Sequence, residues 1–179
     1  TTEIYTLSLH DALPISPAED ILGTLRPVGS GPDIGAYEYS GVRYVKQGGA
    51  GNGSSWANAM GSIQAAIDGL VAAGTGGGEV WVAAGTYTGT TNPVVAKVEH
   101  VDIYGGFTGS EMSRDARDWE ANVTTISGQN SRRCVTGANN ANLDGFTIAK
   151  GSGSGGGMYN NAVSPEVVNC TFTGNSSGL

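Results

Sequence analysis

The feature that most constrains the fold is a short strand-like motif that recurs five times between residues 80 and 175. The first residue is apolar in four of the five copies, the second is usually Thr or Asp, and a glycine follows the third residue within three positions; the third residues lie 21 to 24 positions apart. Alternation of this kind predicts a strand with one buried face, and the glycine suits a turn that needs a positive φ. The copies are Val80–Gly85, Val101–Gly106, Thr124–Gln129, Phe146–Gly151 and Cys170–Asn175.

A period of this length, made of one strand and its turns, is typical of a solenoid. The sequence therefore predicts an all-β fold, a parallel β-helix in which the copies stack on one another. The first residues of the copies, from Val80 to Cys170, are expected to form one inward row. The third residues are expected to form a second inward column of Val82, Ile103, Ile126, Ile148 and Phe172.

One helix is predicted ahead of the first repeated strand. Ser62 is a suitable N-cap, apolar residues recur at helical spacing from Ile63 to Val71, and Gly74 ends the segment. A solenoid leaves core side chains and backbone groups uncovered at its ends, so the helix is expected to cap the N-terminal end, with Trp56 beside it. No such segment follows the last copy, and the fold is expected to be truncated at the C-terminus.

Two groups of motifs resemble known bacterial proteins. Tyr44–Ala59 and Gly78–Tyr87 resemble the start of right-handed β-helix domains of the pectate-lyase-like superfamily, and Tyr104–Glu111 is similar to the same group. Gly155–Tyr159 and Phe172–Asn175 resemble the paired repeats of polymorphic outer-membrane proteins, with a methionine where isoleucine is usual. The resemblance implies a right-handed β-helix on the surface of a bacterium or secreted by it.

The chain is expected to be a fragment with three parts. Residues 1–16 resemble a translated sequencing adapter, so they are interpreted as an artefact and left out of the fold. Asp33–Glu38 resembles the closing motif of choice-of-anchor surface proteins, which implies that residues 17–40 are the closing tail of a preceding module. Residues 41–179 are then the N-terminal cap and first coils of the β-helix, and the fragment is expected to come from environmental DNA.

The composition argues against several kinds of partner. The formal net charge is −7, which gives no attraction to nucleic acid or to anionic membrane surfaces. No apolar run approaches the roughly 18 residues of a membrane span. The two cysteines, Cys134 and Cys170, have no neighbouring ligands for a zinc site; Cys170 is expected inward as a thiol, and a disulfide between the two is the alternative.

Catalytic sites on stacked coils need acids at equal positions in successive strands. The second positions of the copies contain one acid, Asp102, so no catalytic constellation is predicted. The densest charged group lies in residues 108–122, which are expected to protrude as a solvated loop held by internal ion pairs or, alternatively, to form a sugar-binding or catalytic loop. The candidate ligand-binding residues are Glu111, Arg114, Asp115, Arg117 and Asp118, next to Glu120.

The sequence is thus interpreted as a secreted or cell-surface module that serves as a stalk, an adhesin or a glycan-contacting surface. Its expected partner is a polysaccharide or cell-surface glycan, with no nucleic acid, no cofactor and no metal. The alternative is a polysaccharide lyase or glycoside hydrolase whose active coils lie beyond Leu179, with Ca²⁺ as cofactor in the case of a lyase.

Overall fold

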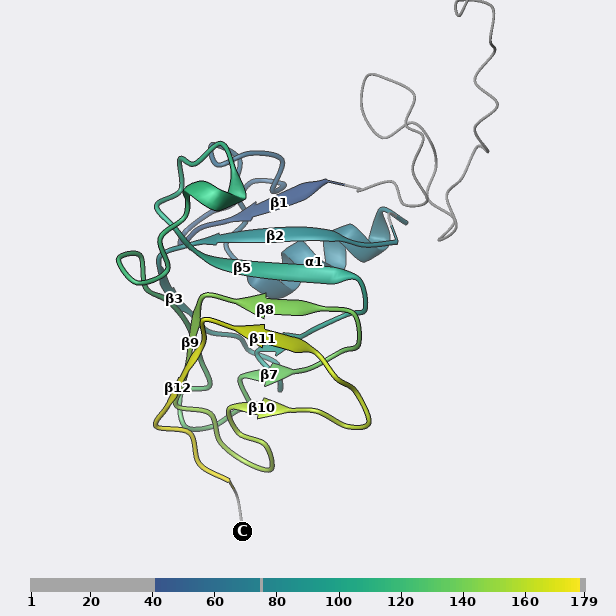
Figure 1. The fold of residues 1–179 in the computed structure, drawn as a ribbon, viewed down its shortest axis with the longest axis vertical. Helices are drawn as coiled ribbons and strands as arrows, with labels where there is room; N and C mark the ends of the chain where they lie inside the picture. Colours follow the sequence, from purple (N-terminus) through teal and green to yellow (C-terminus); the bar gives the residue numbers. More distant parts are fainter. Residues whose placement is uncertain (1–40, 75, 178–179) are drawn as a thin grey trace, which may run out of the picture.

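The structure is a computed structural model that describes residues 41–74 and 76–177 (Figure 1). The segments 1–16 and 17–40, whose origin was predicted from the sequence, lie outside the described residues. Within the described ranges the chain forms twelve strands, one α-helix and a single-turn 3₁₀ helix. All strand pairs are parallel, and they build three separate sheets.

The largest sheet has five strands in the order β1-β2-β5-β8-β11. Figure 1 shows these strands one above another, with the helix α1 behind β2 and β5. Residues of one strand lie in register beside those of the next, except that the register between β2 and β5 shifts between Trp81 and Ala83. Its strands are β1 Val42–Val45, β2 Gly78–Ala83, β5 Val101–Phe107, β8 Asn142–Asp144 and β11 Glu166–Val168.

The other two sheets have four and three strands, in the orders β12-β9-β6-β3 and β10-β7-β4. From β2 onward, consecutive strands belong to the five-stranded, the four-stranded and the three-stranded sheet in turn. The four-stranded sheet contains β3 Gly85–Tyr87, β6 Thr124–Ser127, β9 Phe146–Ala149 and β12 Thr171–Thr173. The three-stranded sheet contains β4 Val95–Ala96, β7 Val135–Thr136 and β10 Met158–Tyr159.

This arrangement corrects the predicted fold class. The described residues form three small parallel sheets with one helix, and parallel strands in several sheets are features of an α/β fold. The prediction of an all-β, right-handed parallel β-helix with a capping helix and one stacked strand per repeat is therefore wrong. The physical reason is that alternation identifies a half-buried strand but does not say which sheet the strand joins.

The register shows where the predicted inward column breaks. Ile103 lies beside Val80 and not beside Val82, which falls at the register shift between β2 and β5. Ile126 lies in another sheet, where its neighbours are Tyr87 and Ile148. The later part of the column is confirmed, since Ile126, Ile148 and Phe172 are in register on β6, β9 and β12. The five repeated motifs are thus divided between two sheets.

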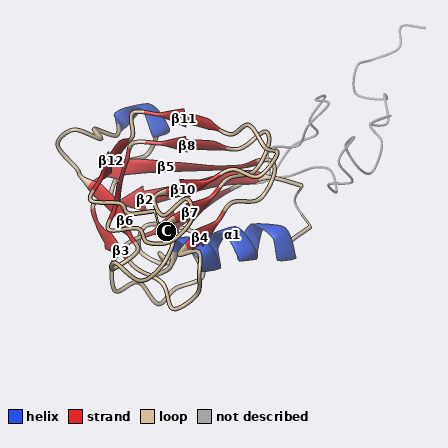
Figure 2. Ribbon diagram, turned by 90° about the horizontal axis from the view of Figure 1, so that it is seen from below, coloured by secondary structure: helices blue, strands red, loops and turns tan. Residues whose placement is uncertain are grey.

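The predicted helix is confirmed as α1, Ile63–Ala72, and the Ser62 side chain accepts a hydrogen bond from the Ala65 N–H at 3.2 Å. Figure 2 shows α1 beside β4, and it also packs on β1 and β2. The helix buries Ile63, Ala66, Ile67 and Leu70. Val71 was expected on the same face, but it is 53% exposed because one further step around the helix turns it outward.

Most of the interior is apolar, but a few polar or charged side chains are buried as well, among them Lys97. Lys97, which follows β4, is 6% exposed, and its ammonium group donates a hydrogen bond to the carbonyl oxygen of Asn142. Burial lowers the pKa of Lys97 to about 7, although nearby Asp102 acts in the opposite direction. Both cysteines are free thiols, Cys134 buried and Cys170 partly buried, so the alternative of a disulfide is not realised.

Candidate functional site

The charged loop between β5 and β6 folds back onto the sheet instead of protruding as expected. The Asp118 N–H donates to the Gly106 carbonyl oxygen at 2.9 Å. Gly106 has a φ of 94°, and a Cβ there would lie 2.7 Å from the Trp119 Cα. A Cβ on Gly145, whose φ is 79°, would lie 2.8 Å from the Arg117 guanidinium. The loop can approach this closely because two glycines lie beneath it.

Arg114 attaches the loop to β2. Its guanidinium donates to a Glu79 carboxylate oxygen at 2.7 Å and to the Tyr104 hydroxyl at 3.1 Å, and it lies 4.8 Å from the centre of the Tyr104 ring. The other Glu79 oxygen accepts from the Trp81 indole N–H at 2.5 Å. The Glu79 side chain is only 8% exposed, and the ion pair with Arg114 and the hydrogen bond from Trp81 compensate its buried charge.

Arg117 attaches the loop to β8 by a more deeply buried ion pair. Its guanidinium donates to Asp144 at 2.5 Å, and the two side chains are 8% and 10% exposed. The guanidinium carbon also lies 5.2 Å from the Tyr104 ring centre and 5.1 Å from that of Trp119. The second Asp144 oxygen accepts from the Asn169 amide at 2.9 Å. Both carboxylate oxygens of Asp144 therefore accept hydrogen bonds, and the residue serves to attach the loop to β8.

The acids of the loop itself mainly hold its turns. Glu111 accepts from the backbone N–H groups of Thr108 and Gly109 at 2.6 and 3.1 Å. Partial burial raises the pKa of Glu111, but hydrogen bonds from backbone N–H groups, including those of Thr108 and Ser110, outweigh it and keep the pKa below its usual value. Asp118 accepts from two N–H groups of the following turn, and Asp115 is exposed in the 3₁₀ helix. A role of the five candidate residues in ligand binding stays a prediction.

Acids do lie side by side on the five-stranded sheet, which the sequence did not show. Glu79 pairs in register with Asp102. Asp102 is occupied, because it accepts from the Asn142 N–H at 2.7 Å and from the Tyr104 hydroxyl at 3.2 Å. Burial, more than the neighbouring carboxylates, raises the pKa of Tyr104 to about 12. These acids were missed because the assumed register placed Asp102 opposite Trp81 instead of Glu79.

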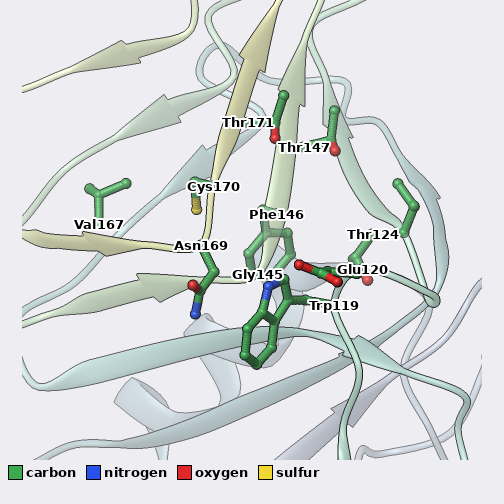
Figure 3. A pocket seen from close by; sticks show the side chains of 11 residues that line it. Trp119, Glu120, Thr124, Gly145, Phe146, Thr147, Val167, Asn169, Cys170 and Thr171 are labelled. Carbon is green, nitrogen blue, oxygen red and sulfur yellow. The ribbon is translucent and has the colours of Figure 1, made fainter.

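A groove of about 510 Å³ lies at the corner where the five-stranded sheet turns into the four-stranded sheet (Figure 3). We call it the corner groove. Its apolar part includes the Trp119 ring, which is 38% exposed, and it also contains Val123, 51% exposed. The groove is lined by Trp119, Glu120, Val123, Thr124, Gly145, Phe146, Thr147, Val167, Asn169, Cys170 and Thr171.

The polar part of the corner groove is rich in groups that both donate and accept hydrogen bonds. The hydroxyls of Thr147 and Thr171 and the amide of Asn169 are of this kind, and Glu120 adds a carboxylate. Glu120 is the one charged residue among those that line the groove. The groove can therefore offer an aromatic surface together with hydrogen bonds to an uncharged polar molecule. The detectable signal in the sequence was Trp119, a large aromatic residue in an otherwise polar loop.

Neither a cluster of metal-binding side chains nor a membrane-spanning helix is found in the described residues. No group of three or more His, Cys, Asp or Glu side chains there could hold a metal ion. None of the helices there has the length and apolar character needed to cross a membrane.

The comparisons with known proteins add no relative. No family model matches this chain, and neither a curated protein nor a solved structure matches it.

Proposed function

We propose that this chain is a secreted or cell-surface module of a bacterium that contacts glycans through the corner groove and carries out no reaction there. The observation that carries the proposal is the Trp119 ring, partly exposed beside Thr147, Thr171 and Asn169. An indole ring packs well on the C–H face of a sugar, and hydroxyl and amide groups at its margin bind the sugar's hydroxyls.

The groups beneath Trp119 support this use of the ring. The Arg117 guanidinium stacks near one side of the indole and is itself fixed by Asp144 and by the Gly105 carbonyl oxygen, to which it donates at 3.1 Å. A site whose aromatic group is already fixed loses less side-chain entropy on binding. The motifs that resemble bacterial surface proteins, including Phe172–Asn175, are the support for the location at the cell surface.

A binding module is favoured over an enzyme by the state of the acids on the five-stranded sheet. Glu79, Asp102 and Asp144 each accept hydrogen bonds from neighbouring protein groups, as described above. A glycoside hydrolase needs two carboxyl groups that face the scissile bond, one of them as proton donor. In the corner groove Glu120 has no second acid among the lining residues.

The test is binding to a panel of soluble and insoluble polysaccharides, measured by affinity electrophoresis and by pull-down. Trp119→Ala should abolish binding, while Met112→Ala, in the same loop and 95% exposed, should leave it unchanged. Thr147→Lys, which fills the groove from the strand side, should also abolish it. Trp fluorescence should change on binding in the unmodified protein.

Two results would overturn the proposal. One is that the Trp119 and Thr147 variants, shown to be folded by an unchanged cooperative melting transition, bind as well as the unmodified chain. The other is that the purified chain releases unsaturated or reducing ends from any polysaccharide of the panel.

A further inference from the structure

The outer face of the four-stranded sheet carries one threonine on each strand at the same register position. Thr86 on β3 pairs with Thr125 on β6, Thr125 pairs with Thr147 on β9, and Thr147 pairs with Thr171 on β12. The next residue on each strand belongs to the opposite, inward side, so the four threonines face outward. All four are exposed or half-buried.

The threonines form a regular ladder of hydroxyl groups. Neighbouring strands lie about 4.8 Å apart, so the ladder repeats at that distance across the sheet. Each hydroxyl has one proton to donate and two lone pairs to accept with. The ladder therefore offers one hydrogen-bond donor and one acceptor group on each strand. A ligand that binds to all four hydroxyls must itself repeat at the distance between strands.

The ladder is continuous with the corner groove. Thr147 and Thr171 line the groove, and Figure 3 shows them next to each other on adjacent strands. Thr125 and Thr86 continue the row on the same face, beyond the residues that line the groove. None of the four rungs is charged, and the groove contributes Glu120 as its one charged side chain.

We propose that the corner groove and the threonine ladder bind one linear, neutral, β-1,4-linked glycan whose chain runs across the strands with one sugar unit per strand. In such an extended glycan the spacing of successive sugar units is close to the strand spacing of about 4.8 Å. The inference rests on the proposed function, because one unit stacks on Trp119 in the groove and the following units extend along the ladder.

The proposal predicts that affinity depends on chain length. A disaccharide occupies the groove and its nearest rungs, whereas a hexasaccharide also reaches Thr125 and Thr86. Each additional sugar adds hydrogen bonds within one molecule, without a second loss of translational freedom. The gain should end once every strand of the sheet is covered.

The experiment is calorimetric titration with cellobiose and cellohexaose. Cellohexaose should bind at least tenfold more tightly than cellobiose. Thr125→Ala and Thr86→Ala should each weaken cellohexaose about fivefold, the usual net effect of one hydrogen bond, and leave cellobiose unchanged. Thr136→Ala is the matched control, because Thr136 lies half-buried on β7 of the three-stranded sheet, and it should change neither affinity.

Equal affinities for the two oligosaccharides would overturn the proposal, and so would loss of both affinities alike in Thr125→Ala and Thr86→Ala. Failure of the unmodified protein to bind either oligosaccharide would also overturn it. The proposed function is decided separately, by the polysaccharide panel and by Trp119→Ala. If the protein binds another glycan through Trp119, the proposed function stands and the proposal for the threonine ladder is wrong.

Discussion

The outermost strands are covered at one end of the three sheets and open at the other. At the first end, the β1 edge is bonded by the segment that follows it: the Tyr44 N–H donates to Gly53 at 3.0 Å, and the Met60 N–H donates to the Tyr44 carbonyl oxygen at 2.8 Å. The Gln47 amide donates to the Thr86 carbonyl oxygen of β3 at 2.7 Å. Gln64 of α1 accepts from the Ala96 N–H of β4 at 2.7 Å.

At the other end, β11, β12 and β10 are the last strands of their sheets, and no described strand pairs with their outer edges. Val167 and Phe172, which continue inward rows of buried residues, are 39% and 47% exposed. The difference teaches that one short segment, residues 46–64, can form hydrogen bonds with all three edges at the first end. Parallel strands with the same inward pattern remain uncovered where no such segment packs on them.

The largest expected effect is on stability and should differ between the two ends. Leu70→Ala removes a side chain that is fully buried between α1 and the sheets, and it should lower the free energy of unfolding by about 2–5 kcal/mol. Phe172→Ala at the open end should cost about 1 kcal/mol or less, because much of the ring already contacts water. Urea denaturation measures both, and equal losses would contradict the contrast.

A second effect comes from Lys97, the buried cation that links β4 at the covered end to β8. Its pKa is about 7 in the folded chain and near 10.5 when unfolded, so the unfolded state binds more protons between these values. Stability should therefore rise with pH across this window. Lys97→Met should remove this contribution and stabilise the chain at neutral pH by on the order of 2 kcal/mol.

The measurement is chemical denaturation of both proteins at several pH values from neutral to alkaline. The difference between the unmodified chain and Lys97→Met isolates the lysine from other titrating groups. A difference that does not vary with pH would show that Lys97 is equally charged in the folded and unfolded states.

The smallest expected effect is association through the open edge. We expect the chain to associate edge to edge with rising concentration, because exposed strands and apolar side chains invite pairing with another copy. Phe172→Lys should weaken this association about tenfold, or about 1.4 kcal/mol. Val71→Lys, an exposed apolar position on α1, is the control and should have no effect.

Sedimentation velocity over a wide concentration range distinguishes these outcomes. A chain that stays monomeric throughout would show that the open edge is harmless. Equal weakening by Val71→Lys would show that charge, and not the edge, governs the association.

Part of the candidate site could be predicted from the sequence. The rest could not, because it depends on residues that are distant in the chain and close only in the folded structure. The charged loop was recognised as the region to examine, but its arginines were expected to pair within the loop. Arg114 and Arg117 instead pair with Glu79 on β2 and Asp144 on β8, which are 35 and 27 residues away in the chain. Spacing along the chain does not reveal such partners, because they depend on which strands become neighbours.

The sequence by itself determined the local structure of the chain. Alternation located the inward residues of the repeated strands, and Ser62 with the apolar spacing after it located α1 to within a residue at either end. These features depend on side chains a few positions apart, which any chain with this pattern shares.

Only the tertiary structure decided how the strands are shared among three sheets, and with that the register. The difference is physical: a strand buries the same face in any sheet, whereas its neighbours depend on where the chain turns, as at Gly145 between β8 and β9. Gly106 on β5 and Gly145 let the loop dock with Trp119 exposed in the corner groove, and the strand register aligns four threonines from four distant segments.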